Sequence, residues 1–475
     1  MKHTDIIQKL NLEQKCALLS GETVFTTRAL PGKGIPAITL SDGPNGVRKQ
    51  AGAADHLGLN PSVPATCFPT SSATACSWDE KLGEAVGEAL GEEAAAQEVA
   101  VLLGPGLNIQ RSPLCGRDFE YFSEDPILAG RMAAAYVRGI QKNGIAACPK
   151  HFAVNSQELR RMASDSVLDE RTLRELYLTG FEIVVKEAKP KTIMTSYNLI
   201  NGTYANENAH LLQDILRKDW GFDGAVVTDW GGSNDHALGV KNGSTLEMPC
   251  PGGDSIRELM KAVQGGRISE ADVDARLDEM LELVLSTHAA VEKAPRTFDA
   301  AAHHKLARRA AAESIVLLRN EGGILPLKPN EKLAVIGDFA ETPRYQGAGS
   351  SAVNALQVDT LLDCIKADDS GITLVGYASG FERQGAADAE KLEEAVALAR
   401  KADTVLLCLG LDELRESEGL DRADMKLAEN QQQLLAAVAA VNPNVVVLLS
   451  AGAPVETPWV GQCRALVYGA LGGQA

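Results

Sequence analysis

Apolar runs that end abruptly in polar residues recur along the first part of the chain. Residues 224–228 read Gly-Ala-Val-Val-Thr, and Asp229 follows directly, ahead of a tryptophan and two glycines. The same arrangement is found at residues 37–40, 145–148 and 192–195. Short continuous apolar runs are typical of parallel strands that are buried on both faces. We therefore expect strands here, with ionisable or hydrogen-bonding side chains at their C-terminal ends.

Helical patterns separate these expected strands. They cover residues 78–97, 169–188 and 254–264, and a further apolar run at 97–103 ends in Gly-Pro-Gly. Alternating strands and helices over about 250 residues are the usual extent of a (β/α)8 barrel. We therefore predict a TIM-like catalytic barrel in residues 1–290, whose active site lies where the strands end.

A second alternating pattern follows. It contains apolar runs at residues 332–336, 372–375, 404–409, 444–449 and 465–471, with helical patterns at 387–401 and 429–441. This spacing predicts a doubly wound, mostly parallel sheet, that is, an α/β sandwich over residues 312–475. We expect residues 291–311 to form a linker. Because the chain stops directly after a strand, we expect the C-terminal end of the sandwich to be missing.

Composition narrows the classes of function. Hydrophobic residues make up 45% of the 475 residues, enough for two cores. The net charge is -17 and Lys or Arg form no run, which disfavours nucleic-acid and anionic-membrane partners. The nine cysteines form no C-x-x-C pair, so a zinc site or disulfide framework is disfavoured. No apolar run is long enough to span a bilayer. Cysteines without a disulfide framework fit a reducing cytoplasm, where we expect the protein to be.

The residues at the expected strand ends are candidates for chemistry. Asp229 could instead cap a following helix, or be a polar strand end that hydrogen-bonds a loop. Lys150, which follows an apolar strand together with His151, needs a partner, because an unpaired buried charge is costly. Arg117 and Arg161, taken singly, would be surface ion pairs. Together with the carboxylates they suggest a polar pocket in which opposite charges keep one another ionised.

Two loops of the second unit bear on such a pocket. Residues 347–352 (Gly-Ala-Gly-Ser-Ser-Ala) are similar to a dinucleotide fingerprint, but no clear helix follows them, so we expect a loop that faces the first domain. Residues 411–422 are rich in carboxylates and could be a solvated acidic loop. They follow the expected strand 404–409, however, and so lie at the edge where ligands of such sheets bind. A carboxyl group reaching into the barrel mouth from there could become a partly desolvated acid.

Several long motifs occur in a fixed order along almost the whole chain. They are residues 41–48 (SDGPNGVR), 104–126, 150–155 (KHFAVN), 194–198 (MTSYN), 227–230 (VTDW), 246–249 (LEMP), 314–320 (SIVLLRN) and 416–422 (ESEGLDR). On these motifs the chain resembles glycoside hydrolase family 3, particularly its β-glucosidases.

The resemblance implies roles for individual residues. It implies Asp229 as nucleophile and Glu418 as acid/base, with Glu416 and Glu413 as fallback choices. The positions matching the family's sugar-binding residues are Asp42, Arg117, Lys150, His151, Arg161, Tyr197 and Trp230. The family's N-acetylglucosaminidase branch is disfavoured, because residues 153–158 lack its His-Asp pair.

The expected activity is that of a retaining, exo-acting β-glycosidase, most of all a β-glucosidase that hydrolyses terminal non-reducing β-D-glucosyl residues by double displacement. Glu418 must begin protonated, which a less polar setting would promote. The alternatives are a β-xylosidase or α-L-arabinofuranosidase with the same mechanism, a lyase or aldolase using Lys150 as a Schiff-base amine, and a non-catalytic carbohydrate-binding chain. We expect no metal and no organic cofactor. The expected partner is a glycoside or small oligosaccharide, and a homo-oligomer stays open.

Overall fold

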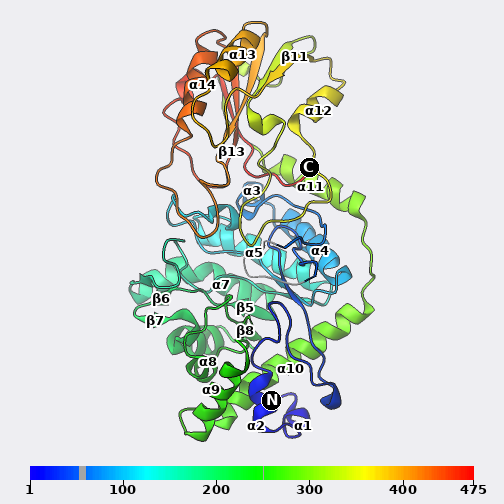
Figure 1. Ribbon diagram of the computed structural model, residues 1–475, viewed down its shortest axis with the longest axis vertical. Coiled ribbons are helices and arrows are strands. Elements are labelled where there is room, and N and C mark those ends of the chain that lie inside the picture. Colours follow the sequence, from blue (N-terminus) through cyan, green and yellow to red (C-terminus); the bar gives the residue numbers. More distant parts are fainter. Residues whose placement is uncertain (53–59, 250) are drawn as a thin grey trace.

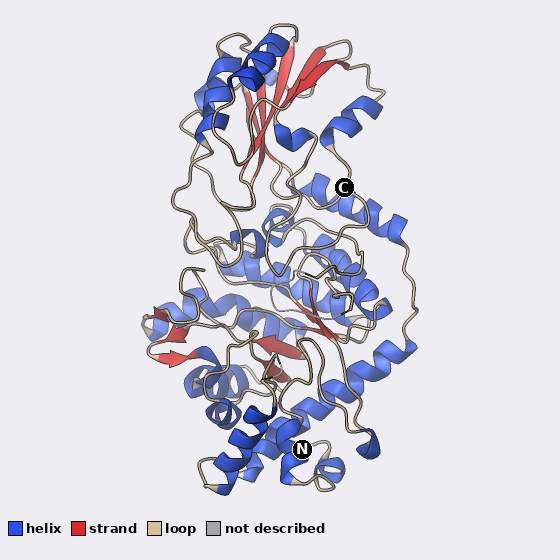
Figure 2. Ribbon diagram, viewed as in Figure 1, coloured by secondary structure: helices blue, strands red, loops and turns tan. Residues whose placement is uncertain are grey.

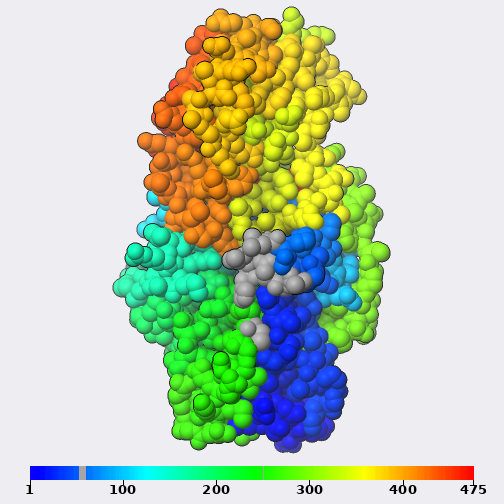
Figure 3. Space-filling model, viewed as in Figure 1, coloured from blue at the N-terminus to red at the C-terminus, as the bar shows by residue number. Residues whose placement is uncertain are grey.

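The computed structural model describes residues 1–52, 60–249 and 251–475. Figure 1 shows two domains stacked along the long axis, with the N-terminus in the lower one and the strands β11 and β13 in the upper one. In the space-filling view the two domains are packed directly against each other (Figure 3). Any site between them can therefore draw side chains from both.

Parallel strands build the centre of the first domain. They are β1 (Leu40–Asp42), β2 (Val101–Leu103), β3 (Ala146–Ala147), β5 (Thr192–Met194) and β8 (Ala225–Val227). The first three form one parallel sheet and the last two pair in parallel. Parallel bridges from Phe152 to Thr195 and from Val227 to Leu246 continue the arrangement. Because these strands run in the same direction, their C-terminal ends meet at one edge, and the predicted α/β class is confirmed.

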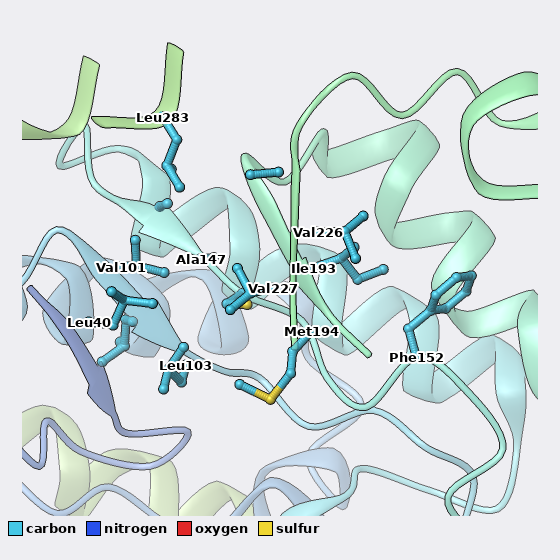
Figure 4. Packing of buried hydrophobic residues seen from close by; sticks show 14 of the residues in the cluster. Leu40, Val101, Leu103, Ala147, Phe152, Ile193, Met194, Val226, Val227 and Leu283 are labelled. Carbon is cyan, nitrogen blue, oxygen red and sulfur yellow. The ribbon is translucent and has the colours of Figure 1, made fainter. Parts of the chain in front are cut away.

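The strands of this domain are held by a core of short apolar side chains. Figure 4 shows Leu40 beside Val101, and Val226 on another strand of the same core, among the surrounding helices. Each of these three side chains is at most 1% exposed. Burying such a side chain contributes about 1.5–3 kcal/mol. The packed core keeps the strand ends, and the polar residues after them, in place.

Helices cover the strands. In the first domain they are α1 (Thr4–Ile7), α2 (Leu12–Ala17), α3 (Ser71–Ala75), α4 (Glu80–Ala96), α5 (Pro126–Gln141), α6 (Glu170–Thr172), α7 (Thr179–Ile183), α8 (His236–Asn242), α9 (Gly253–Gln264) and α10 (Glu270–Lys293). The predicted helix at 169–188 is an alternation of α6, α7 and π-helical turns. Helices α4 and α5 touch at glycines, since a Cβ on Gly87 would lie 2.4 Å from the Tyr136 carbonyl oxygen.

The second domain is a six-stranded sheet in the order β11-β10-β12-β13-β14-β9. Its elements are β9 (Val316–Asn320), β10 (Lys332–Ile336), β11 (Thr373–Ala378), β12 (Thr404–Gly410), β13 (Val445–Ser450), β14 (Ala465–Tyr468) and the helices α12 (Leu361–Ala367), α13 (Ala389–Ala399) and α14 (Glu429–Ala439). Every pairing is parallel except that of β9 with β14. Figure 2 shows how much longer these strands are than those of the first domain. The mostly parallel sheet agrees with the sequence pattern, and β9 adds an antiparallel edge.

The segment between the two sheets is more helical than its polar sequence indicates. Helix α10 ends at Lys293, and α11 (Ala300–Ser314) begins after the six-residue connection 294–299. Residues 291–311 therefore cover the end of one helix, this connection and most of the next helix. Asp299 caps α11 by accepting a hydrogen bond from the Ala302 N–H, which explains why the helix begins there.

Candidate active site

A cavity of about 220 Å³ lies where the first domain meets loops of the second. Its lining residues are Phe25, Asp42, Arg117, Lys150, His151, Arg161, Met194, Tyr197, Asp229 and Trp230 from the first domain, with Ser350 and Glu418 from the second. Every predicted site residue is among them. A larger groove of about 680 Å³ includes Trp78, Leu318 and Tyr468 in its lining. We assign the site to the smaller cavity, because it gathers the cations and carboxylates.

Asp229 follows β8 directly and is 13% exposed. One carboxylate oxygen accepts a hydrogen bond of 2.8 Å from the Trp230 N–H, and the other lies 3.6 Å from His151 Nε2. The next helix, α8, is capped by Asp235, so the helix-cap alternative for Asp229 is wrong. Burial raises the pKa of Asp229, while the charges of Arg161 and Arg117 limit the rise.

His151 is a neutral imidazole with a defined orientation. Burial and the charges of Arg117 and Lys150 hold the pKa of His151 well below its usual range. Asn155 donates to the Tyr121 hydroxyl at 3.0 Å, which leaves that hydroxyl to donate to His151 Nδ1 at 3.1 Å. The ring proton then lies on Nε2, the nitrogen that faces Asp229.

A buried ion cluster holds the two cations at one wall of the cavity. Glu120 lies 2.7 Å from Arg117 Nη2 and 3.0 Å from Lys150 Nζ, and all three side chains are at most 2% exposed. Burial alone would lower the pKa of Lys150, but Glu120 and Asp42 together outweigh it and the pKa is raised. A Schiff-base amine needs a lowered pKa, so the cluster counts against the lyase or aldolase alternative.

Replacement of Glu120 by Ala should destabilise the fold strongly. The change leaves Arg117 and Lys150 buried beside each other without their shared carboxylate, and breaking a buried pair costs about 3–5 kcal/mol. The midpoint of urea unfolding measures this loss. Glu124→Ala, an exposed glutamate four residues on, is the matched control, for which we expect a change within about 0.5 kcal/mol. Equal midpoints for the two variants would contradict the structural role of Glu120.

Glu418 reaches the cavity from the loop that follows β12. One carboxylate oxygen lies 2.9 Å from Arg161 Nη1 and 3.4 Å from Arg117 Nη1. The other accepts the Ser350 N–H at 2.7 Å. Burial would raise the pKa of Glu418, but Arg117 and Arg161 outweigh it and hold the pKa well below its usual range. The expectation of a less polar setting for Glu418 is therefore wrong: its surroundings are cationic.

The glycine-rich loop 347–352 lies against Glu418, and it also faces the first domain, because Arg48 Nη1 donates to the Ser350 carbonyl at 3.0 Å. The Glu418 N–H donates to the Ala348 carbonyl at 3.0 Å. Gly349 has a φ of +119°, and a Cβ there would lie 2.4 Å from the Cβ of Glu418. Only glycine fits this position. The loop thus supports a carboxylate, and its resemblance to a dinucleotide fingerprint reflects this close packing.

The two fallback glutamates lie outside the cavity. Glu416 is fully buried, 3.5 Å from Arg344, and accepts the Gly452 N–H at 3.2 Å. Glu413 is 41% exposed and pairs with Arg383 at 3.3 Å. Of the three glutamates, only Glu418 lines the cavity.

Asp42, the last residue of β1, offers its carboxylate to the cavity. Within the described ranges its side chain makes no hydrogen bond to protein, which leaves both oxygens available to a ligand. Burial raises the pKa of Asp42 to about 6, against the opposing charges of Lys150 and Arg48. The carboxylate is therefore largely ionised at neutral pH and becomes protonated in mild acid.

Aromatic rings form another wall. The Tyr197 hydroxyl donates to the Trp230 carbonyl at 2.9 Å, and the Arg161 guanidinium lies over the Tyr197 ring, 4.8 Å from its centre. The Trp230 indole N–H donates to the Val24 carbonyl at 2.8 Å, and its ring centre lies 5.3 Å from that of Phe25. An apolar ring face beside hydrogen-bonding groups suits a ligand that has both C–H and O–H surfaces.

Three cavity residues escaped the sequence reasoning. Ser350 belongs to the glycine-rich loop, which was expected to face the first domain without a defined role. Met194 ends β5, next to the strand-end residues that were identified. Phe25 carries no recognisable signal: it reaches the cavity because the Leu40 N–H donates to its carbonyl at 2.8 Å.

Across residues 1–52, 60–249 and 251–475, no group of three or more His, Cys, Asp or Glu side chains is arranged to hold a metal ion. In the same ranges no helix combines the length and the apolar character needed to cross a bilayer. The cavity itself sets two carboxyl groups, Asp229 and Glu418, among fixed cations.

Many known proteins are similar to this chain in sequence or in structure. Residues 48–283 match the family model described as Glycosyl hydrolase family 3 N terminal domain, and residues 315–475 match Glycosyl hydrolase family 3 C-terminal domain. Thermostable beta-glucosidase B of Acetivibrio thermocellus is 46% identical over 99% of this chain and 62% of its own length. An exo-alpha-(1->6)-L-arabinopyranosidase of Bifidobacterium breve is 43% identical over 99% of this chain and 63% of its own length.

Solved structures of the same family are similar to this chain in fold. The GH3 beta-glucosidase of Bifidobacterium adolescentis superposes with a TM-score of 0.93 at 42% identity, covering 99% of this chain and 67% of that one. The chain thus spans 62–63% of the length of the curated relatives named here. Both family models, these identities and the shared fold together show that the chain belongs to glycoside hydrolase family 3.

Proposed function

We propose that this protein is a retaining, exo-acting β-glycosidase, and foremost a β-glucosidase that removes terminal non-reducing β-D-glucosyl residues. The observation that carries the proposal is that Asp229 and Glu418, which come from different domains, line one small cavity with groups suited to sugar hydroxyls. Retaining glycosidases need two carboxyl groups flanking the scissile bond. The relatives named beta-glucosidase support the choice of sugar.

In the first step, the Asp229 carboxylate attacks the anomeric carbon and forms a glycosyl ester. The bond to the leaving oxygen breaks, and that oxygen takes a proton from Glu418. The Trp230 N–H, which donates to Asp229 at 2.8 Å, keeps the carboxylate oriented while it is an anion. In the second step, Glu418 takes a proton from water, the water attacks the anomeric carbon, and Asp229 leaves as a carboxylate.

The proton on Glu418 needs an explanation, because two arginines favour its ionised form. Arg161 already divides its contacts, since the same Nη1 atom lies 2.7 Å from Glu158 and 2.9 Å from Glu418. We propose that bound substrate takes over N–H groups of Arg161 and excludes water from the cavity. Both changes raise the pKa of Glu418 in the complex, where the acid is needed.

Sugar hydroxyls are the proposed ligands of the remaining polar groups. Asp42 accepts hydrogen bonds and Lys150 donates them, and charge-assisted bonds of this kind are stronger than neutral ones. Trp230 and Phe25 would face the C–H surface of the ring. Bonds that tighten as the ring flattens toward an oxocarbenium-like transition state would contribute to kcat rather than to binding alone.

We extend the proposal to the domain architecture. We interpret residues 1–290 as a TIM-like barrel and residues 312–475 as the α/β sandwich, with 291–311 between them. The parallel strands that end at the cavity support the barrel interpretation. The cytoplasmic location and a homo-oligomeric state stay predictions.

Acidification should inactivate the enzyme through two carboxyl groups. Asp42, with its pKa raised to about 6, and Asp229, with its pKa also raised, must both be ionised, so kcat/KM falls as pH drops through their folded-state pKa values. We expect Asp42→Asn to lower kcat/KM throughout and to make the acid limb of log kcat/KM shallower by one proton, because an amide does not titrate there. An unchanged slope in this variant would show that protonation of Asp42 is not one of the steps that lower kcat/KM.

The function itself is tested with 4-nitrophenyl glycosides. We expect the highest kcat/KM with the β-D-glucoside, and lower values with the β-D-xyloside and the α-L-arabinofuranoside. The α-L-arabinopyranoside belongs in the panel, because a relative named for that sugar is 43% identical over nearly the whole chain. If the enzyme preferred one of these pentosides, the assigned sugar would be that pentose instead of glucose. Binding of glucose without turnover of any member would favour the non-catalytic alternative.

A further inference from the structure

Asp421 joins loops of both domains beside the cavity without lining it. From this geometry we infer that Asp421 is a positioning residue that holds Glu418 over the first-domain half of the site. The inference rests on the proposed function, since it assigns Asp421 a part in supplying the acid/base group. Asp421 belongs to the same loop as Glu418, residues 416–422.

The Asp421 carboxylate binds the backbone of two separate first-domain loops. Its Oδ1 accepts the Gly116 N–H at 3.2 Å and the Glu158 N–H at 2.9 Å. Its Oδ2 accepts the Leu159 N–H at 2.9 Å. Three backbone donors on one carboxylate make a charge-assisted, directional contact across the domain boundary. Asp421 therefore fixes the second-domain loop to both first-domain loops at once.

A reciprocal contact runs the other way. The Glu158 side chain is fully buried, and its Oε2 accepts the Gly419 N–H at 2.8 Å. The same oxygen lies 2.7 Å from Arg161 Nη1, the group that also binds Glu418. Gly419 is the residue after Glu418, so this contact and that of Asp421 hold the chain on the C-terminal side of the acid/base.

The two loops are packed without room for adjustment. A Cβ on Gly116 would lie 1.8 Å from the Leu420 carbonyl oxygen and 2.4 Å from that of Ser417. The Arg422 N–H donates to the Leu114 carbonyl at 2.8 Å. The backbone on both sides of Glu418 thus lies directly against the first domain, and Asp421 supplies the charged anchor of that contact.

Position matters here because the two proposed catalytic carboxyls belong to different domains. The distance between Asp229 and Glu418 depends on how the second-domain loop sits on the first domain. A misplacement of about 1 Å can lower a catalysed rate about 100-fold. Asp421 therefore acts on the rate through Glu418. Removing the contacts of Asp421 should lower the activity of a chain that has Glu418, but not of a chain that lacks it.

The test compares Asp421→Asn with Asp424→Asn in the full chain, each in the natural background and together with Glu418→Ala. Asn keeps the size of the side chain, but only one of its two terminal atoms can accept a hydrogen bond. Asp424 is the matched control: it is exposed and accepts a single local bond, from the Lys426 N–H. The substrate is phenyl β-D-glucoside, whose poor leaving group demands an acid.

We expect Asp421→Asn to lower kcat/KM about 100-fold in the natural background and to have no further effect beside Glu418→Ala. Asp424→Asn should change neither. Hydrogen–deuterium exchange of the peptide spanning residues 416–422 gives a readout that needs no activity. This exchange should become faster in Asp421→Asn and stay unchanged in Asp424→Asn. Thermal unfolding checks that each variant is folded, and Asp421→Ser, which keeps one acceptor, replaces the Asn variant if that does not fold.

Each outcome decides the inference. Equal losses in both backgrounds would show that Asp421 acts on the fold rather than through Glu418, and unaltered exchange of the loop would overturn the inference whatever the activity. Failure of both Asp421 variants to fold would overturn it as well. If the unsubstituted chain hydrolyses no aryl glycoside while the loop still exchanges faster in Asp421→Asn, the proposed function fails but the anchoring role of Asp421 stands.

Discussion

Asp229→Asn is expected to abolish turnover of the preferred aryl glycoside, with kcat lowered by roughly 10⁴- to 10⁶-fold, as for the loss of other catalytic nucleophiles. An amide cannot form the glycosyl ester that double displacement requires. The loss should appear with every leaving group, because attack by Asp229 comes before any role of the acid. The measurement is the steady-state release of 4-nitrophenol from its β-D-glucoside.

The fold should survive this substitution. Asn has the same shape as Asp, and its side-chain oxygen can still accept the Trp230 N–H. Asp223→Asn is the matched control: this exposed aspartate lies just before β8, at the end of the strand away from the cavity. We expect the control to keep full activity. A kcat for Asp229→Asn within tenfold of the unsubstituted chain would falsify the assignment.

A direct chemical test complements the kinetics. A 2-deoxy-2-fluoro-β-D-glucosyl fluoride should slow hydrolysis of the ester more than its formation, so the intermediate accumulates. Mass spectrometry of the digested protein should then find the sugar on the peptide that contains Asp229. A label on another carboxylate, such as Asp42, would move the nucleophile there while keeping the retaining mechanism.

Much of this site could be predicted because its residues follow apolar strands. Asp229, Lys150 and His151 each come directly after a run that is buried on both faces, and parallel strands bring such ends to one edge. No comparable local rule exists for Arg117, which precedes a single 3₁₀ turn, Asp118–Glu120. Pooling it with the carboxylates indicates a polar pocket, and the resemblance to a family then assigns it a place in the site.

The charge around Glu418 could not be predicted, since it depends on three loops that meet only in the fold. Arg117, Arg161 and the Ser350 N–H all point at this carboxylate, yet they lie far from it in sequence. An acidic loop at a sheet edge indicates a carboxyl group near the site but not its neighbours. For the same reason Glu120 went unnoticed: its importance lies in joining Arg117 to Lys150.

Phe25 and the segment 291–311 show two other limits. Phe25 enters the cavity through pairing with residues near β1, a contact between segments with no periodic pattern to indicate it. In the segment 291–311, polar residues and a proline favour a linker, but the alanine-rich stretch from Ala300 is a good helix former with Asp299 as its cap. The helix propensity of the alanines decides the structure of this segment, and its polar composition does not indicate it.

Glu418→Ala is expected to slow the enzyme in a way that depends on the leaving group. Without a general acid, hydrolysis of phenyl β-D-glucoside should fall about 10²- to 10⁴-fold. A 2,4-dinitrophenyl glycoside needs no proton to leave, so its first step should be nearly unaffected. The ester on Asp229 then accumulates, because the base for the second step is also missing. We therefore expect a rapid initial burst of dinitrophenol release, followed by slow turnover.

Azide should rescue this variant, and the structure gives the reason. Removing the carboxylate leaves Arg117, Arg161 and the Ser350 N–H facing an empty space, which suits a small anion. Azide needs no base to attack the ester, and the product should be the β-glucosyl azide, with the configuration retained. Arg117 is held by Glu120 as well, so the anion site should persist after the substitution.

The control for this experiment is Glu413→Ala. Glu413 belongs to the same acidic loop but is 41% exposed, pairs with Arg383 and does not line the cavity, so we expect neither a leaving-group effect nor azide rescue. Glu416→Gln, at the buried glutamate beside Arg344, should likewise show no azide product, although it could weaken the fold. If either of these variants gave the glycosyl azide and Glu418→Ala did not, the acid/base would be that residue. The loop would then have to change its conformation when substrate binds, because Glu418 is the glutamate of this loop that reaches the cavity.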